Sequence, residues 1–189
     1  MPGPRPARRP QSGVIAMRRL RVIVALGALL GLFAGVVTAS PALAGRGLKW
    51  QFLPAKPFTL PAGFCGFKIR VTPLANKEFT KILKTADGSM TVLFTGSAKW
   101  SFTNLSTGKA FTENVSGPGK ITMNADGSAV GVAKGHTPLF LPPPDAKRFG
   151  LPPVSVLAGR MTLSVDSAGN LTSVSLRGHV LVDACAVLS

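Results

Sequence analysis

Tyrosine is absent from this chain of 189 residues, and carboxylates are scarce, with seven Asp and Glu against 22 Lys and Arg. There are two cysteines and two histidines. The sequence contains no G-x-S-x-G elbow, no H-E-x-x-H pair, no G-x-x-x-x-G-K loop and no C-x-x-C pair. These absences exclude the common serine-hydrolase, zinc-protease and nucleotide-binding patterns. Two isolated histidines make a poor metal site, so we expect neither a metal nor a cofactor.

The scarcity of acids leaves a net charge of +15. Residues 1–44 hold six arginines and no acid, so 16 basic and seven acidic residues remain from 45 onward, a charge of +9. Such a balance favours anionic surroundings such as envelope polymers, although it also serves simple solubility. The basic residues form no run after position 45, and we therefore expect no specific binding of nucleic acid.

The N-terminal region has the three parts of a secretory signal. An uncharged apolar run at 22–37 follows three arginines between positions 18 and 21, and Ala42-Leu43-Ala44 provides the cleavage site. The run is shorter than the roughly 20 residues of a membrane anchor, which is the alternative interpretation. We expect cleavage after Ala44. Arg21 interrupts a twin-arginine pattern, so the general secretory route is predicted.

The Pro/Arg-rich segment 1–16 precedes this signal. It is either a disordered extension or the product of an upstream start, with Met17 as the true first residue in place of Met1. In both cases the mature protein is predicted to be secreted, without a membrane span, and monomeric.

Cys65 and Cys185 both follow the signal, and export leads to an oxidising compartment. We predict that they form one disulfide. It would close a loop of about 120 residues, worth on the order of 4–5 kcal/mol in the chain-entropy model.

Alternating apolar and polar residues dominate the mature chain and predict an all-β domain at 65–189. The longest case runs from Met90 to Thr103, with Gly96 near its centre as a predicted bend. Residues 45–64, interrupted by three prolines, are expected to form an extended leading arm laid against the sheet or along its edge.

The breaks in the pattern are turn sequences at 86–89, 105–108, 125–128 and 166–170. They predict an antiparallel meander of about eight strands. We expect a closed barrel, with a two-sheet sandwich as the alternative. The segment 139–154 has five prolines and is predicted to be a long ordered loop over one mouth of the barrel.

Three aspartates, Asp87, Asp126 and Asp166, lie in these turns and are interpreted as turn formers. The remaining carboxylates are the candidates for chemistry: Glu78, Glu113, Asp145 and Asp183.

One possible site follows from the strand faces. Glu113 shares parity with Phe111 and Val115 on its strand. Likewise, Lys134 and His136 share parity with Val130 and Val132. If these faces are interior, the three polar residues would gather in an apolar cavity, where a carboxylate and an imidazole suit acid–base work. The alternative is that a bulge or strand end turns them to solvent. His179 is interpreted as external, and Asp183 as a surface partner of Arg177 or of a neighbouring Lys.

Three stretches resemble small secreted proteins of high-GC actinobacteria: NLSTGKAFTENVSGPG (104–119), DGSAVGVAKGHTPLF (126–140) and DSAGNLTSVSLRGHVLVDAC (166–185). The likeness covers nearly all of the mature chain. That group has no assigned activity, so the resemblance implies export and a β-rich fold and transfers no catalytic residue. Lipocalins and allene-oxide-cyclase-like proteins share the expected barrel class, but fold does not fix function.

Three hypotheses of function follow. The first is a secreted binding module for a small apolar ligand or an anionic envelope polymer. The second is an enzyme with Glu113 and His136 as the acid–base pair and Lys134 as an electrostatic helper. The third is a structural or inhibitory protein that uses the Pro-rich segment as its contact surface.

Overall fold

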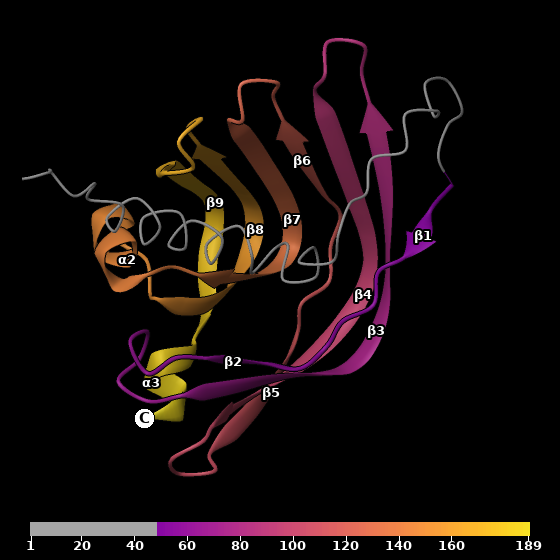
Figure 1. Cartoon of the computed structure of the whole chain (residues 1–189). Helices are drawn as coiled ribbons and strands as arrows, with labels where there is room; N and C mark the ends of the chain where they lie inside the picture. The colour runs from indigo at the N-terminus through magenta and orange to yellow at the C-terminus, as the bar shows by residue number, and fades with distance from the viewer. Residues whose placement is uncertain (1–48) are drawn as a thin grey trace, which may run out of the picture.

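The computed structural model describes residues 49–189, so the predicted signal peptide and its cleavage site lie outside the described residues. These residues form one antiparallel sheet with nine strands (Figure 1). The strands are β1 (Gln51–Phe52), β2 (Phe58–Leu60), β3 (Ile69–Lys84), β4 (Met90–Asn104), β5 (Ala110–Asn114), β6 (Gly119–Met123), β7 (Ala129–Phe140), β8 (Val154–Val165) and β9 (Leu171–Asp183). Two short helices, α2 (Pro143–Phe149) and α3 (Ala184–Leu188), complete the fold.

The sheet order is β1-β3-β4-β6-β7-β8-β9, with β2 also on β3 and β5 also on β4. From β3 onward this follows the predicted meander, because consecutive strands are neighbours in the sheet except for β5 and β6, which both pair with β4. The β3–β4, β6–β7 and β8–β9 hairpins turn at the predicted sites and lie at the same end of the sheet (Figure 1). We call this end the hairpin end.

The prediction of a closed barrel is wrong. The sheet stays open, and its order ends at β9 without a return to β3. The fold is sandwich-like instead, because β4 changes partner along its length: its first part pairs with β6 and its last part with β5. The far ends of β3 and β4 can therefore bend away from β6 and pack across the other strands (Figure 1). The leading arm runs along β3 as β1 and β2, which pair with that edge at two and at three positions.

A line of glycines marks this bend, and we call it the glycine crease. Gly135, Gly159 and Gly178 are direct partners across β7, β8 and β9. Gly159 has φ 126°, and a Cβ atom there would overlap the carbonyl oxygen of Arg177 on the next strand. Gly96, the predicted bend in β4, has φ 140° and would overlap β3 in the same way. Only glycine combines such a φ with so close an approach of backbones.

The aromatic core lies on the other side of the crease from the hairpin end. Phe58 meets Phe140 edge to face at 5.7 Å, and Phe102 stacks on Phe111 at 4.9 Å between ring centroids. Val154 and Val156 close this core from β8 and are fully buried. The aromatic core thus lies between the β2–β5 part of the sheet and the ends of β7 and β8, as the two layers of a sandwich enclose theirs.

A second cluster, the α2 core, lies on the opposite face of β7 and β8. Ala133 and Met161 are partners in the register and both are buried in it. Helix α2 contributes Ala146, with Phe149 packed alongside. The Pro-rich segment is therefore not a plain loop: its ends extend β7 and β8, and its middle is a helix. Prolines fit here because the first turn of a helix needs no donor from their nitrogen.

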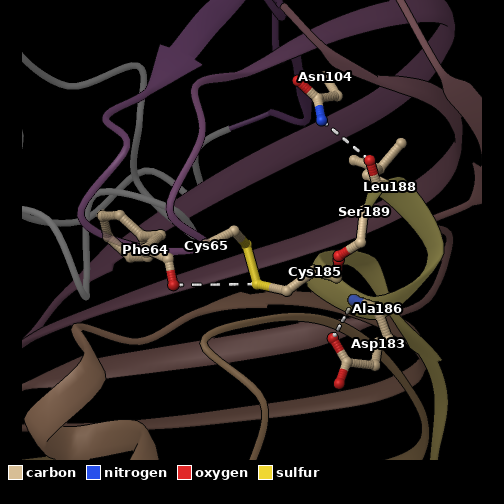
Figure 2. Close-up of a disulfide and its surroundings, with 8 residues drawn as sticks. All are labelled: Phe64, Cys65, Asn104, Asp183, Cys185, Ala186, Leu188 and Ser189. Carbon is tan, nitrogen blue, oxygen red and sulfur yellow. Dashed lines mark hydrogen bonds between the residues drawn. A yellow bond between two sulfur atoms is a disulfide. The ribbon is translucent and has the colours of Figure 1, made fainter. Parts of the chain in front are cut away.

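The predicted disulfide is present and joins Cys65 to Cys185, with Cα atoms 5.2 Å apart (Figure 2). Helix α3 carries Cys185, and the Asp183 carboxylate caps it by accepting the Ala186 N–H at 3.2 Å. The buried Asn104 amide donates to the Leu188 carbonyl at 2.9 Å. The C-terminus is thus tied to the aromatic core by one disulfide and by one hydrogen bond from Asn104 of β4.

Candidate anion-binding face

The sheet has an outer face, opposite the α2 core, in the part between the crease and the hairpin end. The register places Leu93, Lys120, Val132, Thr162 and Ser175 in one row across β4, β6, β7, β8 and β9. Their strand neighbours Val92, Ile121 and Leu163 are buried on the other side. Since side chains alternate between the faces of a strand, the row belongs to the outer face.

Six basic side chains come from five strands to this outer face. Lys81 is half-buried and the other five are exposed. Five of them lie between the crease and the hairpin end: Lys81 on β3, Lys120 on β6, Lys134 on β7, Arg160 on β8 and Arg177 on β9. The sixth, Lys77 on β3, lies opposite Ser97, one pair beyond the Glu78–Gly96 pair of the crease. The strand order makes them one surface, although up to 100 positions separate them in the sequence.

None of the seven carboxylates lies on the outer face. Asp87, Asp126 and Asp166 are in the hairpin turns, and the other four are placed on the inner side of the sheet or at the helices. Within residues 49–189 a single ion pair occurs, between Asp145 and Arg148 of α2 at 3.5 Å. The positive charge of the outer face is therefore not neutralised by the described part of the chain.

The strongest concentration of charge is a row of three cations next to the crease. Lys134 pairs with Arg160, and Arg160 pairs with Arg177, so the three stand side by side on β7, β8 and β9. Strands lie about 4.8 Å apart, which places all three within about 10 Å. Like charges directly opposite one another on a sheet are destabilising. This row costs stability, and no carboxylate of residues 49–189 pairs with it to offset the cost.

A shallow pocket of about 260 Å³ lies at this row, lined by Arg160, Thr162, Ser175 and Arg177. The register explains it. Arg160 faces Arg177, and one step along the same face Thr162 faces Ser175, so two long cationic side chains stand beside two short hydroxyl side chains. The four positions form a rectangle with guanidinium groups on one side and hydroxyl groups on the other.

The turn aspartates act as predicted. The Asp126 carboxylate accepts the Ser128 backbone N–H at 2.9 Å, and Asp166 accepts that of Asn170 at 2.8 Å. Hydrogen bonds from Thr85 and Ser89 lower the pKa of Asp87 to about 2. Side-chain and backbone hydrogen bonds also lower the pKa values of Asp126 and Asp166. These carboxylates therefore keep their charge at the hairpin end, away from the outer face.

The three residues expected to form an acid–base site are not gathered in one cavity. Lys134 is exposed on the outer face, together with Val130, because the buried positions of this strand are Ala129, Gly131 and Ala133. The condition of the acid–base hypothesis, that Val130 and Val132 face the interior, is therefore not met. The small residues are interior because α2 core residues of β8 fill the space next to them, and a Cβ at Gly131 would meet the Leu163 side chain at 3.2 Å.

Glu113 and His136 are both half-buried, at the border of the aromatic core. Glu113 is the register partner of Trp100, and the backbone N–H of His136 donates to the Ser116 carbonyl at 3.0 Å. No hydrogen bond or ion pair links their side chains among the described residues, and the buried His136 Nδ1 has no partner there. The adjacent interior is filled by Phe102 and its aromatic neighbours.

The other candidates have structural roles or different surroundings. Asp183 caps α3 and does not pair with Arg177, and Asp145 pairs within α2. Glu78 lies opposite Gly96 at the crease, where burial raises its pKa. His179 is exposed, as predicted, in the register row that also holds Ala158 and His136.

The convergence of Arg160, Thr162, Ser175 and Arg177 was not predicted from the sequence. Parity along β8 and β9 puts both pairs on polar faces, which was a usable signal. Their register was the missing information, because hairpin pairing through the 166–170 turn decides which residues stand opposite one another.

The described chain offers little support for other kinds of site. Within residues 49–189 no three His, Cys, Asp or Glu side chains lie close enough to hold a metal ion. No helix in that range is long and apolar enough to span a membrane. No protein-family model, curated protein or solved structure matches the chain, so the outer face has to be interpreted from its own geometry.

Proposed function

We propose that this protein is an exported binding domain that attaches to an anionic polymer of the cell envelope through the outer face of its sheet. The observation that carries the proposal is the unneutralised charge: six cations from five strands and no carboxylate on the same surface. A surface of one sign raises the local concentration of oppositely charged partners and speeds their association.

The rest of the fold fits this role. The disulfide and the two hydrophobic cores hold the sheet, while the outer face is left to solvent. Spreading the cations over a rigid sheet fixes their spacing, which suits a repeating anion better than a single small one. The signal sequence would deliver the domain to the compartment that contains such polymers.

The test is retention of the purified protein by isolated cell walls at low and high salt. We expect retention at low salt and release at high salt, because salt screens charges that are exposed to solvent. The triple variant Lys77→Gln, Lys120→Gln and Lys134→Gln should be retained much less. Its matched control carries Lys56→Gln, Lys68→Gln and Lys147→Gln, three exposed lysines away from the outer face.

Both triple variants lose the same net charge, so only the position of the lost charge differs. Absence of retention at low salt for the unmodified protein would contradict the proposal. Equal weakening by the two triple variants would also contradict it, since binding would then follow net charge and not the outer face.

A further inference from the structure

The pocket beside the crease offers an arrangement of hydrogen-bond donors as well as positive charge. Arg160 and Arg177 are direct cross-strand partners, and so are Thr162 and Ser175. Arginine presents several N–H donors in a planar fork, and threonine and serine each add a hydroxyl donor. All four line one pocket, so several donors surround one small volume.

We infer that this pocket binds a phosphate group, and hence that the polymer of the proposed function, on which this inference rests, is one that carries phosphate. Guanidinium groups match phosphate oxygens in paired hydrogen bonds. A phosphate offers oxygens in three dimensions, toward both arginines and toward the hydroxyls beside them. A carboxylate has two oxygens in one plane and can satisfy one fork, which leaves the second arginine and the hydroxyls without a partner.

The like-charged row gives an independent reason. Lys134, Arg160 and Arg177 stand side by side and repel one another, and none has an ion-pair partner among residues 49–189. A bound phosphate would relieve that repulsion at Arg160 and Arg177, and Lys134 lies next in the row to meet a second anionic group. The spacing of about 5 Å between adjacent strands makes the row suitable for consecutive charges along a flexible polymer.

The first experiment measures binding of inorganic phosphate to the purified protein by calorimetry, in a phosphate-free buffer with about 150 mM salt to suppress diffuse attraction. We expect saturable binding with one strong site. The double variant Arg160→Gln and Arg177→Gln should lose about tenfold or more in affinity, because it removes both charge-assisted donors. The matched control, Lys56→Gln with Lys68→Gln, removes the same charge from exposed positions away from the outer face and should stay within about twofold, because the donors of the pocket remain in place.

A second variant keeps the charge unchanged. Thr162→Val with Ser175→Ala removes both hydroxyls and should weaken phosphate binding several-fold while leaving the net charge as it is. Thermal unfolding of every variant checks that the sheet remains folded. Equal losses in the two Gln doubles, or unaltered binding in the hydroxyl double, would overturn the inference of a specific phosphate site.

Parallel measurements separate the two proposals and the two sources of phosphate. Poly(glycerol phosphate) should bind more tightly than polyglutamate of similar charge, and free phosphate should compete. Retention by cell walls without any phosphate binding would overturn the site and leave the proposed function standing. Binding of inorganic phosphate without binding of either polymer or of walls would support the site with free phosphate as its ligand, and would overturn the proposed function.

Discussion

The regions on the two sides of the glycine crease are built differently. The aromatic-core region is enclosed by two layers of strands and joined to the C-terminus by the disulfide. The region toward the hairpin end has the α2 core on one face and solvent on the other, where the cations stand. The contrast shows that one region stabilises the fold with strands on both sides of its core, while the other buries one face of the same sheet and presents charge on the opposite face.

Loss of the disulfide, which belongs to the aromatic-core region, should have the largest effect on the free energy of unfolding. The double variant Cys65→Ser and Cys185→Ser releases a loop that spans 120 positions, and we expect a loss of about 4–5 kcal/mol in the free energy of unfolding. Denaturant unfolding measures it, and reduction of the unmodified protein should give a similar loss. A loss below about 1 kcal/mol, far less than loop closure of this length contributes, would show that the aromatic core holds α3 by itself.

Truncation of a side chain inside the aromatic core should have the second largest effect on stability. Phe102→Ala removes a fully buried ring that contacts Phe111, Trp100 and Phe140, and should cost about 3–5 kcal/mol. The comparison variant is Phe79→Ala, a ring that is 41% exposed and contacts Phe52. Chemical denaturation of both should give a much smaller loss for Phe79→Ala; similar losses would argue against a dominant aromatic core.

The crease itself is tested by Gly159→Ala. Its φ of 126° is unfavourable for alanine, and the added Cβ would overlap the Arg177 carbonyl oxygen, so we expect a loss of about 1–3 kcal/mol or more. Because Arg177 is displaced, phosphate binding should weaken as well. Gly63→Ala is the control, since a Cβ there meets no atom within 4 Å. Equal melting temperatures for the two variants would show that the crease does not require glycine at position 159.

A smaller effect is expected at the hairpin end. The pKa of Asp87 is lowered to about 2 in the folded protein, so its contribution is fully present above the unfolded pKa near 4 and is lost as the pH falls toward 2. Asp87→Asn should therefore lower the melting temperature at pH 6 and approach the unmodified protein at pH 2–3. A difference that is independent of pH would mean that the turn responds to shape and not to charge.

Glu78 should make stability depend on pH in the opposite direction to Asp87. Burial raises the pKa of Glu78, so the folded state binds its proton more readily than the unfolded state does. The contribution of Glu78 to the free energy of unfolding therefore declines as the pH rises above the pKa of the unfolded state and through that of the folded state. Glu78→Gln removes the buried charge, and its melting temperature should gain on the unmodified protein between pH 4 and pH 7. A relative loss over that range would indicate a stabilising partner for the carboxylate.

Much of this architecture could be predicted from local patterns. Alternation located the long strand β4, and turn residues located the hairpins, because both depend on residues that are close in sequence. The pairing of Cys65 with Cys185 followed from there being two cysteines after the predicted signal. The assignment of Asp87, Asp126 and Asp166 to turns followed from the turn sequences themselves.

Closure of the sheet and the inward face of β7 could not be predicted. The acid–base hypothesis required Val130 and Val132 to face the interior, yet Ala129 and Ala133 are buried instead, since the large side chains of β8 leave room only for small ones. The prediction of a closed barrel was wrong for a similar reason, because the change of partner along β4 depends on contacts between distant strands.

By itself the sequence determined a basic, disulfide-linked β-meander and predicted its export, because charge, alternation and signal are properties of composition and of neighbouring residues. Only the tertiary structure decided that the sheet stays open, and that Lys134, Arg160 and Arg177 form one row beside two hydroxyls. Register and bending are set by contacts between strands far apart in the chain, and a shift of one residue would have moved each of these side chains to the other face.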